Sequence, residues 1–175
     1  MDLLLSYYWN HFSRARREAV YVLRKMGDPG PEVERSKVMG IAIVHTSLNN
    51  REVIQKCKEL FKGGFVLRFA IKWVPVDFWC ETSLDSMKKV IDESITVGIG
   101  VNETWGMQVE KRRWQKYHTI QIIEHLAAGI NRKVNLNSPD KLIRVDVVGE
   151  RTAVSLLKPG EIFSTTSASC TFSSR

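Results

Sequence analysis

The sequence of 175 residues contains few cysteines and no long apolar segment. Cys57, Cys80 and Cys170 are far apart and form no Cys-x-x-Cys pair, so their spacing favours neither a disulfide framework nor a structural zinc site. No apolar run is long enough to span a bilayer, and the N-terminal residues lack the basic region and the cleavage site of a secretory signal. We therefore expect a cytoplasmic protein that does not enter a membrane.

The common catalytic and nucleotide-binding motifs are also missing. The sequence has no phosphate-binding loop, no dinucleotide fingerprint, no Gly-x-Ser-x-Gly and no His-Glu-x-x-His, and its four histidines are not spaced as metal ligands usually are. We expect no cofactor, no metal site and no catalytic residue. The alternative is an enzyme with an unrecognised site, which would require four side chains to converge: Cys80, Glu81, Arg113 and His118.

Hydrophobic residues and positive charges are both plentiful. The hydrophobic content of 43% is enough to build packed cores, which excludes a wholly disordered chain. Lys and Arg number 26 against 19 acidic residues, which gives a formal charge of +7 and a pI near 9.5. This excess favours an anionic partner, although it carries no information about the fold.

The first half of the chain alternates between strand and helix patterns. Residues 3–9 and 38–44 are apolar enough for buried strands, and residues 65–73 alternate between apolar and polar positions. Between these strands, residues 12–26 and 49–61 place apolar side chains at helical spacing. The pattern predicts a β-α-β-α-β unit.

Residues that favour helix ends support this interpretation. Gly27 is placed to end the first helix. Asn49 with Glu52 resembles a capping box at the start of the second helix, and Thr82 with Asp85 is expected to begin a third.

The second half predicts the order α-β-α-β-β. Helical spacing covers residues 82–95 and returns in a helix that ends near residue 128. Residues 105–109 and 143–147 alternate as strands, and a glycine-first turn connects the latter to a final strand at 152–157. The whole chain is therefore expected to be a mixed α/β (α+β) protein.

We place the boundary between two modules near residue 80, although no flexible linker marks it. The first module covers residues 1–80 and the second covers residues 81–163. After Phe163, eight of the twelve remaining residues are Ser or Thr, which predicts a disordered tail over residues 164–175.

Positive charge is concentrated in two places. Residues 1–80 hold thirteen basic and eight acidic residues, a balance of +5. Within the second module, residues 105–144 hold eight basic and three acidic residues, which is again +5. Several cations acting together can supply most of a salt-sensitive affinity for nucleic acid.

The best candidate for a nucleic-acid site follows the strand at 105–109. Cations here are interleaved with aromatic rings, so phosphates and unpaired bases could both be contacted. The alternative is that the rings pack in the core while the cations form a solvated edge. The candidate RNA-binding residues are Lys111, Arg112, Arg113, Trp114 and Lys116.

The first module offers further cations. One face of its first helix carries Arg14, Arg17, Tyr21, Arg24 and Lys25, for which a solvated outer face is the default interpretation. Two more cations are expected on one face of the strand at residues 65–73, where they would meet a partner or water. The candidates in this module are Arg14, Arg17, Arg68 and Lys72.

The order of motifs in the second module resembles the THUMP domain, an RNA-binding module of thiouridine synthases, RNA methyltransferases and some pseudouridine synthases. The resemblance rests on Trp105-x-Met107-x-Val109-Glu110-Lys111-Arg112-Arg113, then Arg132-Lys133-Val134-Asn135-Leu136-x-x-Pro139-Asp140-x-x-Ile143-x-Val145, and a final hairpin. The resemblance extends from about residue 2 to residue 163. Over this range the chain is similar to the stand-alone archaeal members, which are related to the Tan-type adapter of tRNA acetylation.

This resemblance implies a ferredoxin-like module followed by a THUMP-type module that together bind tRNA near its acceptor end. It adds Arg132 and Lys133 to the phosphate-contacting candidates. Asn135 departs from the family, which more often has Asp there, so any electrostatic role at that position is in doubt.

The function that follows is a non-catalytic adapter. It would offer tRNA to a separate RNA-modifying enzyme such as an RNA cytidine acetyltransferase, with cytidine N4-acetylation as the outcome. No DNA partner is expected. Besides the enzyme alternative, a regulatory ferredoxin-like module that binds a small ligand or a protein remains open.

Overall fold

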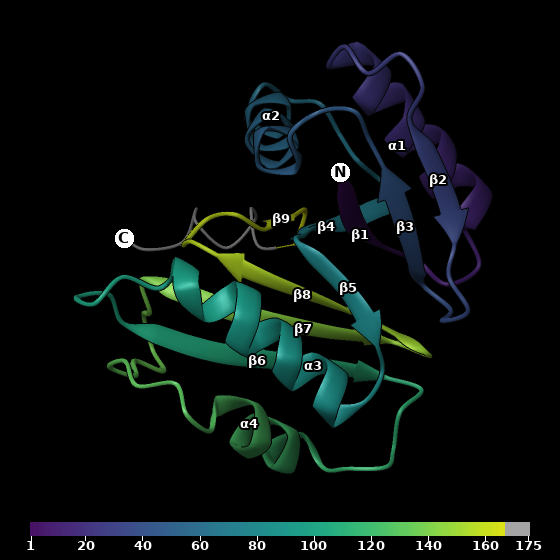
Figure 1. Cartoon of the computed structure of the whole chain (residues 1–175). Helices are drawn as coiled ribbons and strands as arrows, with labels where there is room; N and C mark the ends of the chain where they lie inside the picture. Colours follow the sequence, from purple (N-terminus) through teal and green to yellow (C-terminus); the bar gives the residue numbers. More distant parts are fainter. Residues whose placement is uncertain (167–175) are drawn as a thin grey trace, which may run out of the picture. The chain divides into compact units, whose positions relative to one another are not determined.

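The computed structural model describes residues 1–166, and this part of the chain divides into two compact units (Figure 1). Among the described residues, unit 1 comprises Met1–Pro75 together with Gly160–Thr166, and unit 2 comprises Val76–Pro159. The division lies between residues 75 and 76 rather than near residue 80, because β5 (Phe78–Glu81) pairs with a strand of unit 2.

The chain returns to unit 1 after residue 159. A short strand, β9 (Phe163–Ser164), pairs with β4 of unit 1, so the segment that begins at Ser164 starts inside a sheet. Its pairing partner lies about ninety residues earlier in the chain, and sequence patterns carry no signal for such a distant pairing. Residues 167–175, which the sequence predicts to be disordered, lie outside the described residues.

Unit 1 has the ferredoxin-like order of strands and helices. The predicted β-α-β-α-β order is confirmed, with one more strand, β2, inserted before β3. The sheet order is β2-β3-β1-β4-β9. The elements are β1 (Asp2–Tyr7), α1 (Phe12–Lys25), β2 (Glu32–Arg35), β3 (Ile41–His45), α2 (Asn50–Lys62), β4 (Ala70–Val76) and β9.

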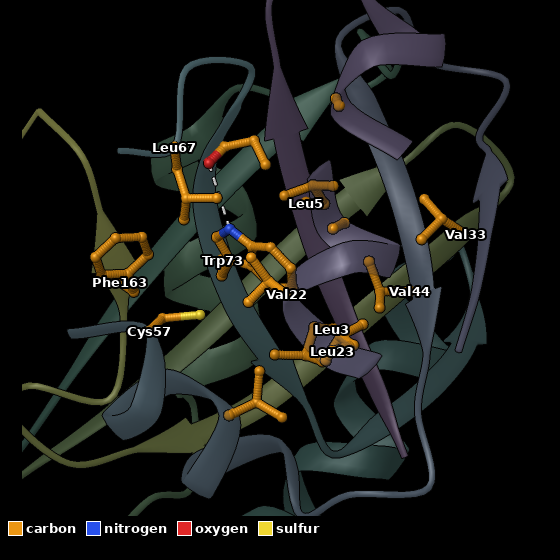
Figure 2. Packing of buried hydrophobic residues seen from close by; sticks show 14 of the residues in the cluster. Leu3, Leu5, Val22, Leu23, Val33, Val44, Cys57, Leu67, Trp73 and Phe163 are labelled. Carbon is orange, nitrogen blue, oxygen red and sulfur yellow. Dashed lines mark hydrogen bonds between the residues drawn. The ribbon is translucent and has the colours of Figure 1, made fainter. Parts of the chain in front are cut away.

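The core of unit 1 lies between its two helices and one face of the sheet. Figure 2 shows Trp73 of β4 among the hydrophobic side chains of this core. Its indole N–H donates to the carbonyl of Ala70 at 3.4 Å. Trp73 is fully buried, as are Leu3 and Leu5 of β1. The fully buried residues that α1 contributes to this core are Ala15, Ala19, Val22 and Leu23.

The Asn49 cap and the Gly27 helix end are confirmed in unit 1. The Asn49 side chain accepts from the backbone N–H groups of Arg51 and Glu52, at 2.9 and 3.2 Å, and so satisfies two donors that the first turn of α2 leaves unpaired. Gly27, with φ of +100°, follows α1 and donates to the carbonyl of Arg24. Glycine takes up this left-handed conformation without steric cost.

The strand predicted at residues 65–73 begins later than expected, at Ala70. The backbone N–H groups of Arg68, Phe69 and Ala70 donate to the carboxylate of Glu18 on α1, at 2.8, 2.9 and 2.8 Å. Because these donors are satisfied by a side chain, the segment before β4 needs no neighbouring strand. Arg68 therefore lies outside the strand, and it does not share a strand face with Lys72.

Unit 2 confirms the predicted α-β-α-β-β order and adds β5 in front. Its sheet order is β5-β8-β7-β6, with β6 and β7 parallel and the other pairs antiparallel. The remaining elements are α3 (Leu84–Val90), a π-helical turn (Ile91–Ile95), a 3-10 turn (Thr96–Gly98), β6 (Trp105–Arg112), α4 (Thr119–Ala127), β7 (Lys141–Val148) and β8 (Arg151–Leu157).

The core of unit 2 lies where α3, the π-helical turn and α4 pack against one face of the sheet. Ile91 and Ile122 are fully buried there against Ile143 and Val145 of the central strand β7. The start of α3 differs by one residue from the prediction, because the side chain of Ser83, and not that of Thr82, accepts from the backbone of the first turn. The expected mixed α+β fold with two sheets is confirmed.

Candidate nucleic-acid interface

The basic segment after residue 110 covers the end of β6 and the loop that follows it. Lys111 and Arg112 are the last residues of β6, whereas α4 begins only at Thr119. Arg113 has a φ of +59°, a left-handed conformation that is costly for a residue with a side chain. The chain thus turns sharply where the edge strand ends, and the exposed Arg113 lies at this turn.

Lys111 and Arg112 both have partners inside unit 2. The Lys111 Nζ donates to the carbonyl of Tyr117 at 2.5 Å, which ties the loop to the strand. The Arg112 Nη1 donates to Oδ1 of the buried Asp146 at 3.0 Å, and the Arg112 side chain is 25% exposed. These two cations therefore hold the end of β6 in place.

The two aromatic residues of the loop pack against the core of unit 2, as the alternative interpretation proposed. The rings of Trp114 and Tyr117 meet edge to face with centroids 5.5 Å apart, and both residues are half-buried. Lys116 is exposed, and its Nζ lies 5.4 Å from the centre of the Tyr117 ring. Lys116 is thus presented on a fixed aromatic support.

Arg132 and Lys133 are exposed residues on a segment that is fixed through its backbone. The carbonyl of Arg132 accepts from the Trp105 indole N–H at 3.1 Å, and that of Lys133 accepts from the Trp105 backbone N–H at 3.0 Å. The Asn135 side chain closes a local turn, accepting from the backbone N–H groups of Asn137 and Ser138. An amide is sufficient for this turn.

The structure separates the candidates of unit 2 into two groups. Arg132 and Lys133 lie beside Trp105, the first residue of β6, to which their carbonyls are hydrogen-bonded. Residues 111–116 lie at the other end of the strand. Eight residues of strand span roughly 23 Å. The single cluster that the local charge count of +5 had indicated is therefore two groups at opposite ends of one edge strand.

Sequence analysis missed a buried ionic network in unit 2. It lies on the face of the sheet opposite the hydrophobic core, because Arg144 and Asp146 alternate along β7 with the core residues Ile143 and Val145. Arg144 donates from Nε to Oδ2 of Asp146 at 2.7 Å and from Nη2 to Oδ1 at 3.1 Å, and Arg112 adds a third bond to this carboxylate. Glu110 is 3.9 Å from Arg144. Strand alternation predicted polar side chains at positions 144 and 146, but it could not indicate that both are almost fully buried.

This network also changes the charge balance at the surface. Burial raises the pKa of Asp146, whereas the hydrogen bonds and charges of Arg144 and Arg112 lower it by a larger amount. The net pKa is below the ordinary value, so the group is a carboxylate at neutral pH. Arg144 is 1% exposed and cannot reach a partner. Lys141 also faces a carboxylate, that of Glu103, at 3.8 Å.

The candidates of unit 1 lie on α1 and on β4 with the segment before it. Arg14 and Arg17 are exposed on α1, and the guanidinium of Arg14 lies 5.2 Å from the centre of the Phe69 ring. Arg68 is exposed ahead of β4, and Lys72 is half-buried on β4 opposite Ser164.

Two residues of the alternative catalytic site, Cys80 and Arg113, are separated within unit 2. Cys80 is on β5 at one edge of the sheet, and Arg113 follows β6 at the other edge, three strand spacings or about 14 Å away. Burial, together with the neighbouring Glu81, raises the pKa of Cys80 to about 11, so its thiol is protonated at neutral pH. This arrangement does not favour a nucleophilic cysteine.

Among residues 1–166, no group of His, Cys, Asp and Glu side chains is arranged to hold a metal ion. No helix in this part of the chain combines the length and the apolar character needed to cross a membrane.

Comparisons with known proteins show the fold. No family model matches the sequence, and no curated protein matches it. Solved structures match over most of this chain: PH1313 from Pyrococcus horikoshii (TM-score 0.57, 15% identity, 90% of this chain and 55% of that one) and TrmN from Thermus thermophilus (TM-score 0.57, 15% identity, 91% and 46%).

A third similar structure is a 4-thiouridine synthetase in complex with RNA and ATP (TM-score 0.54, 15% identity, 93% of this chain and 41% of that one). This chain thus spans about half the length of these proteins. At this level of identity, what these proteins have in common with this chain is the fold.

Proposed function

We propose that this protein binds folded tRNA as a non-catalytic adapter and presents it to an RNA-modifying enzyme. The observation that carries the proposal is the fold match, over 93% of this chain, to a synthetase whose structure contains RNA. The basic composition supports it, because the polyanionic backbone of tRNA is attracted to a chain of net charge +7.

Exposed cations at both ends of β6 are the proposed phosphate contacts in unit 2. One group consists of Arg113 and Lys116, and the other consists of Arg132 and Lys133. Their separation of roughly 23 Å suits contacts to the extended backbone of a folded RNA better than a pocket for one nucleotide. Arg112 has a structural role in this proposal, because its guanidinium bonds the buried Asp146.

The proposal that the chemistry lies on another polypeptide has two supports. The cysteine of the alternative active site is a protonated thiol, and its supposed partner Arg113 lies at the opposite edge of the sheet. We further propose that the enzyme is an RNA cytidine acetyltransferase, in line with the motif resemblance of the second unit. Adding this protein to such an enzyme with tRNA and its acetyl donor should raise the yield of N4-acetylcytidine, measured by mass spectrometry of digested tRNA.

Titrating total tRNA across a range of salt concentrations tests the binding itself. Replacing Arg113 and Lys116 together by alanine should reduce the slope of log K against log salt by about 1.4 to 1.8, since each phosphate contact contributes roughly 0.7 to 0.9. The same holds for Arg132→Ala with Lys133→Ala. The matched control is Lys89→Ala with Arg151→Ala, which removes the same charge from exposed positions elsewhere in unit 2.

If the control pair changes the slope as much as the test pairs, binding depends on net charge and not on these sites. If the wild-type protein does not bind tRNA at any salt concentration, the proposed function is wrong.

A further inference from the structure

A second surface with the chemistry of a nucleic-acid site lies on α1 in unit 1. We call it the α1 basic face, and it consists of Arg14, Arg17, Tyr21 and Lys25 together with Phe65 and Phe69 from the segment before β4. The inference below rests on the proposed RNA binding and concerns which part of an RNA this face contacts.

The cations of α1 are not neutralised by acidic neighbours. The helix contains five basic residues and one acidic residue, Glu18. None of the ion pairs found among the described residues involves these five cations. The Glu18 carboxylate is directed at the backbone, where it accepts three N–H groups at the start of β4.

Unit 2 offers a contrast. Two cations of its predicted patch, Arg112 and Arg144, share the carboxylate of Asp146, and Lys141 lies near Glu103. Residues 1–80 and residues 105–144 each carry a local excess of +5. The structure therefore leaves the α1 basic face with more of its charge available to a partner.

Aromatic rings hold these cations in place. The Lys25 Nζ lies 5.6 Å from the centre of the Phe65 ring, and the Arg14 guanidinium lies 5.2 Å from that of Phe69. Both phenylalanines pack against the core of unit 1, so they form a fixed support. Cation–π contacts of this kind limit the motion of long side chains before any ligand arrives.

Tyr21 provides an exposed ring at the centre of this face. Its ring is stacked on Phe65 with centroids 6.1 Å apart and an angle of 12° between the planes, yet Tyr21 remains 57% exposed. One side of the ring is thus supported by a core residue while much of the side chain meets solvent. A supported, exposed aromatic ring between cations is the arrangement on which unpaired bases stack.

Surface hollows flank Tyr21. One of about 500 Å³ is lined by Arg14, Arg17, Glu18, Tyr21 and Phe69. A second, of about 840 Å³, lies along the other side of α1 and shares Arg17 and Tyr21. Both hollows are open to solvent, so a base has room beside the ring without being enclosed.

We propose that the α1 basic face binds a single-stranded stretch of RNA, with one unpaired base stacked on Tyr21 and the flanking phosphates contacted by Arg14, Arg17 and Lys25. The cations alone would attract any polyanion, including an acidic protein or an anionic membrane. The supported ring favours a single-stranded nucleic acid, because its unpaired bases present flat faces on the same chain that carries the phosphates. The proposed function makes that nucleic acid an RNA.

The test uses the full chain and a fluorescein-labelled single-stranded oligoribonucleotide of eight nucleotides, with binding followed by anisotropy. Tyr21→Ala should weaken binding about 10-fold, in keeping with alanine substitutions at stacking residues. Tyr21→Phe keeps the ring and should restore it. Arg17→Ala with Lys25→Ala should lower the salt slope by about 1.4. The control Lys37→Ala removes an exposed cation from the turn between β2 and β3 of the same unit, which lines neither hollow, and should have a smaller effect.

The outcomes separate this inference from the proposed function. One outcome is that total tRNA binds more weakly to Arg113→Ala with Lys116→Ala, while Tyr21→Ala leaves the affinity for the oligonucleotide unchanged. The proposed function then stands and the α1 site is wrong. If Tyr21→Ala and Tyr21→Phe weaken binding equally, stacking is wrong. Tyr21-dependent binding to polyglutamate or to phosphatidylserine vesicles, without RNA binding, would overturn both proposals.

Discussion

Arg144 and Asp146 are two nearly inaccessible charged residues that lie two positions apart on the central strand β7. Side chains two residues apart in a strand point to the same face, which allows the guanidinium of Arg144 to bind both oxygens of Asp146. A buried pair of this kind adds little net stability compared with apolar residues, but removing one partner leaves the other charge buried without compensation.

Asp146→Asn should therefore destabilise the protein by about 3–5 kcal/mol. The chemical or thermal unfolding of the variant should be compared with that of Glu124→Gln, an exposed change on α4 that should stay within about 0.5 kcal/mol of the wild type. An Asp146→Asn variant as stable as this control would show that the network contributes nothing.

The same pair gives stability a defined dependence on pH. Because the pKa of Asp146 is lower in the folded protein than the value of about 3.9 in an unfolded chain, its contribution is complete well above pH 4. The contribution is lost as the pH falls through 3.9 toward the folded pKa. The difference in unfolding free energy between wild type and Asp146→Asn should thus be constant from pH 5 to 7 and shrink below pH 4.

The thiols of Cys57 and Cys80 should react slowly in the folded protein. Burial raises the pKa of Cys57 to about 12, and burial with the charge of Glu81 raises that of Cys80 to about 11, so the thiolate fraction at pH 7.5 is very small. In a Cys170→Ser background, iodoacetamide should modify both cysteines slowly before and rapidly after addition of denaturant, as measured by mass spectrometry. Fast native labelling of Cys80 would revive the alternative of a nucleophilic cysteine.

At the scale of elements, Glu18 connects α1 to β4 through three backbone hydrogen bonds. Hydrogen bonds to a charged group are worth about 1.5–3 kcal/mol each when their loss leaves donors unsatisfied, although water can replace some of them at this half-buried position. Glu18→Ala should cost about 2–3 kcal/mol.

The local consequence of Glu18→Ala is more specific than the global one. Amide exchange at Arg68, Phe69 and Ala70 should accelerate in the variant beyond the change expected from its lower stability. The control is Glu59→Ala, an exposed glutamate on α2 that should leave those amides unaffected. Equal exchange in both variants would contradict the role of Glu18.

The elements that the sequence predicts well are those whose signals are local. The apolar stripe of α1 and the Asn49 cap lie within a few residues of the backbone they organise, and both are confirmed. The start of β4 and the short strand β2 were missed because a distant carboxylate determines the first, and the second contains a single buried residue, Val33. The division into two groups of cations likewise depends on the length of β6.

Charge presents the same difficulty at a site. Counting cations in a window of sequence treats Arg112, Arg144 and Lys133 alike. In the structure Arg112 bonds Asp146 of the neighbouring strand, and Arg144 is buried against the same carboxylate two residues along its own strand. Lys133 is exposed and takes part in none of the ion pairs found among the described residues. Composition therefore predicts an anionic partner, but only the register of the strands tells which cations can meet it.

At the scale of the whole molecule, unit 1 is built from two separate segments of the chain. The main part ends at Pro75, and the chain comes back after Pro159 to add β9 beside β4. Phe163 of β9 is 2% exposed, and its ring meets that of Phe61 from α2 edge to face at 5.7 Å. The return segment thus supplies a core residue as well as an edge strand.

Phe163→Ala should destabilise unit 1 by about 3–5 kcal/mol, because it removes a buried ring and leaves a cavity between β4 and α2. The matched control on the same strand is Ser164→Ala, which keeps the backbone pairing with Lys72 and should change stability by less than about 1 kcal/mol. Urea unfolding followed by tryptophan fluorescence measures the loss, and amide exchange locates it.

Because Phe163 belongs to unit 1, protection should fall in β1 and β4 while amides of β7 respond less. A uniform loss of protection in both sheets would mean that the two units unfold as one cooperative body.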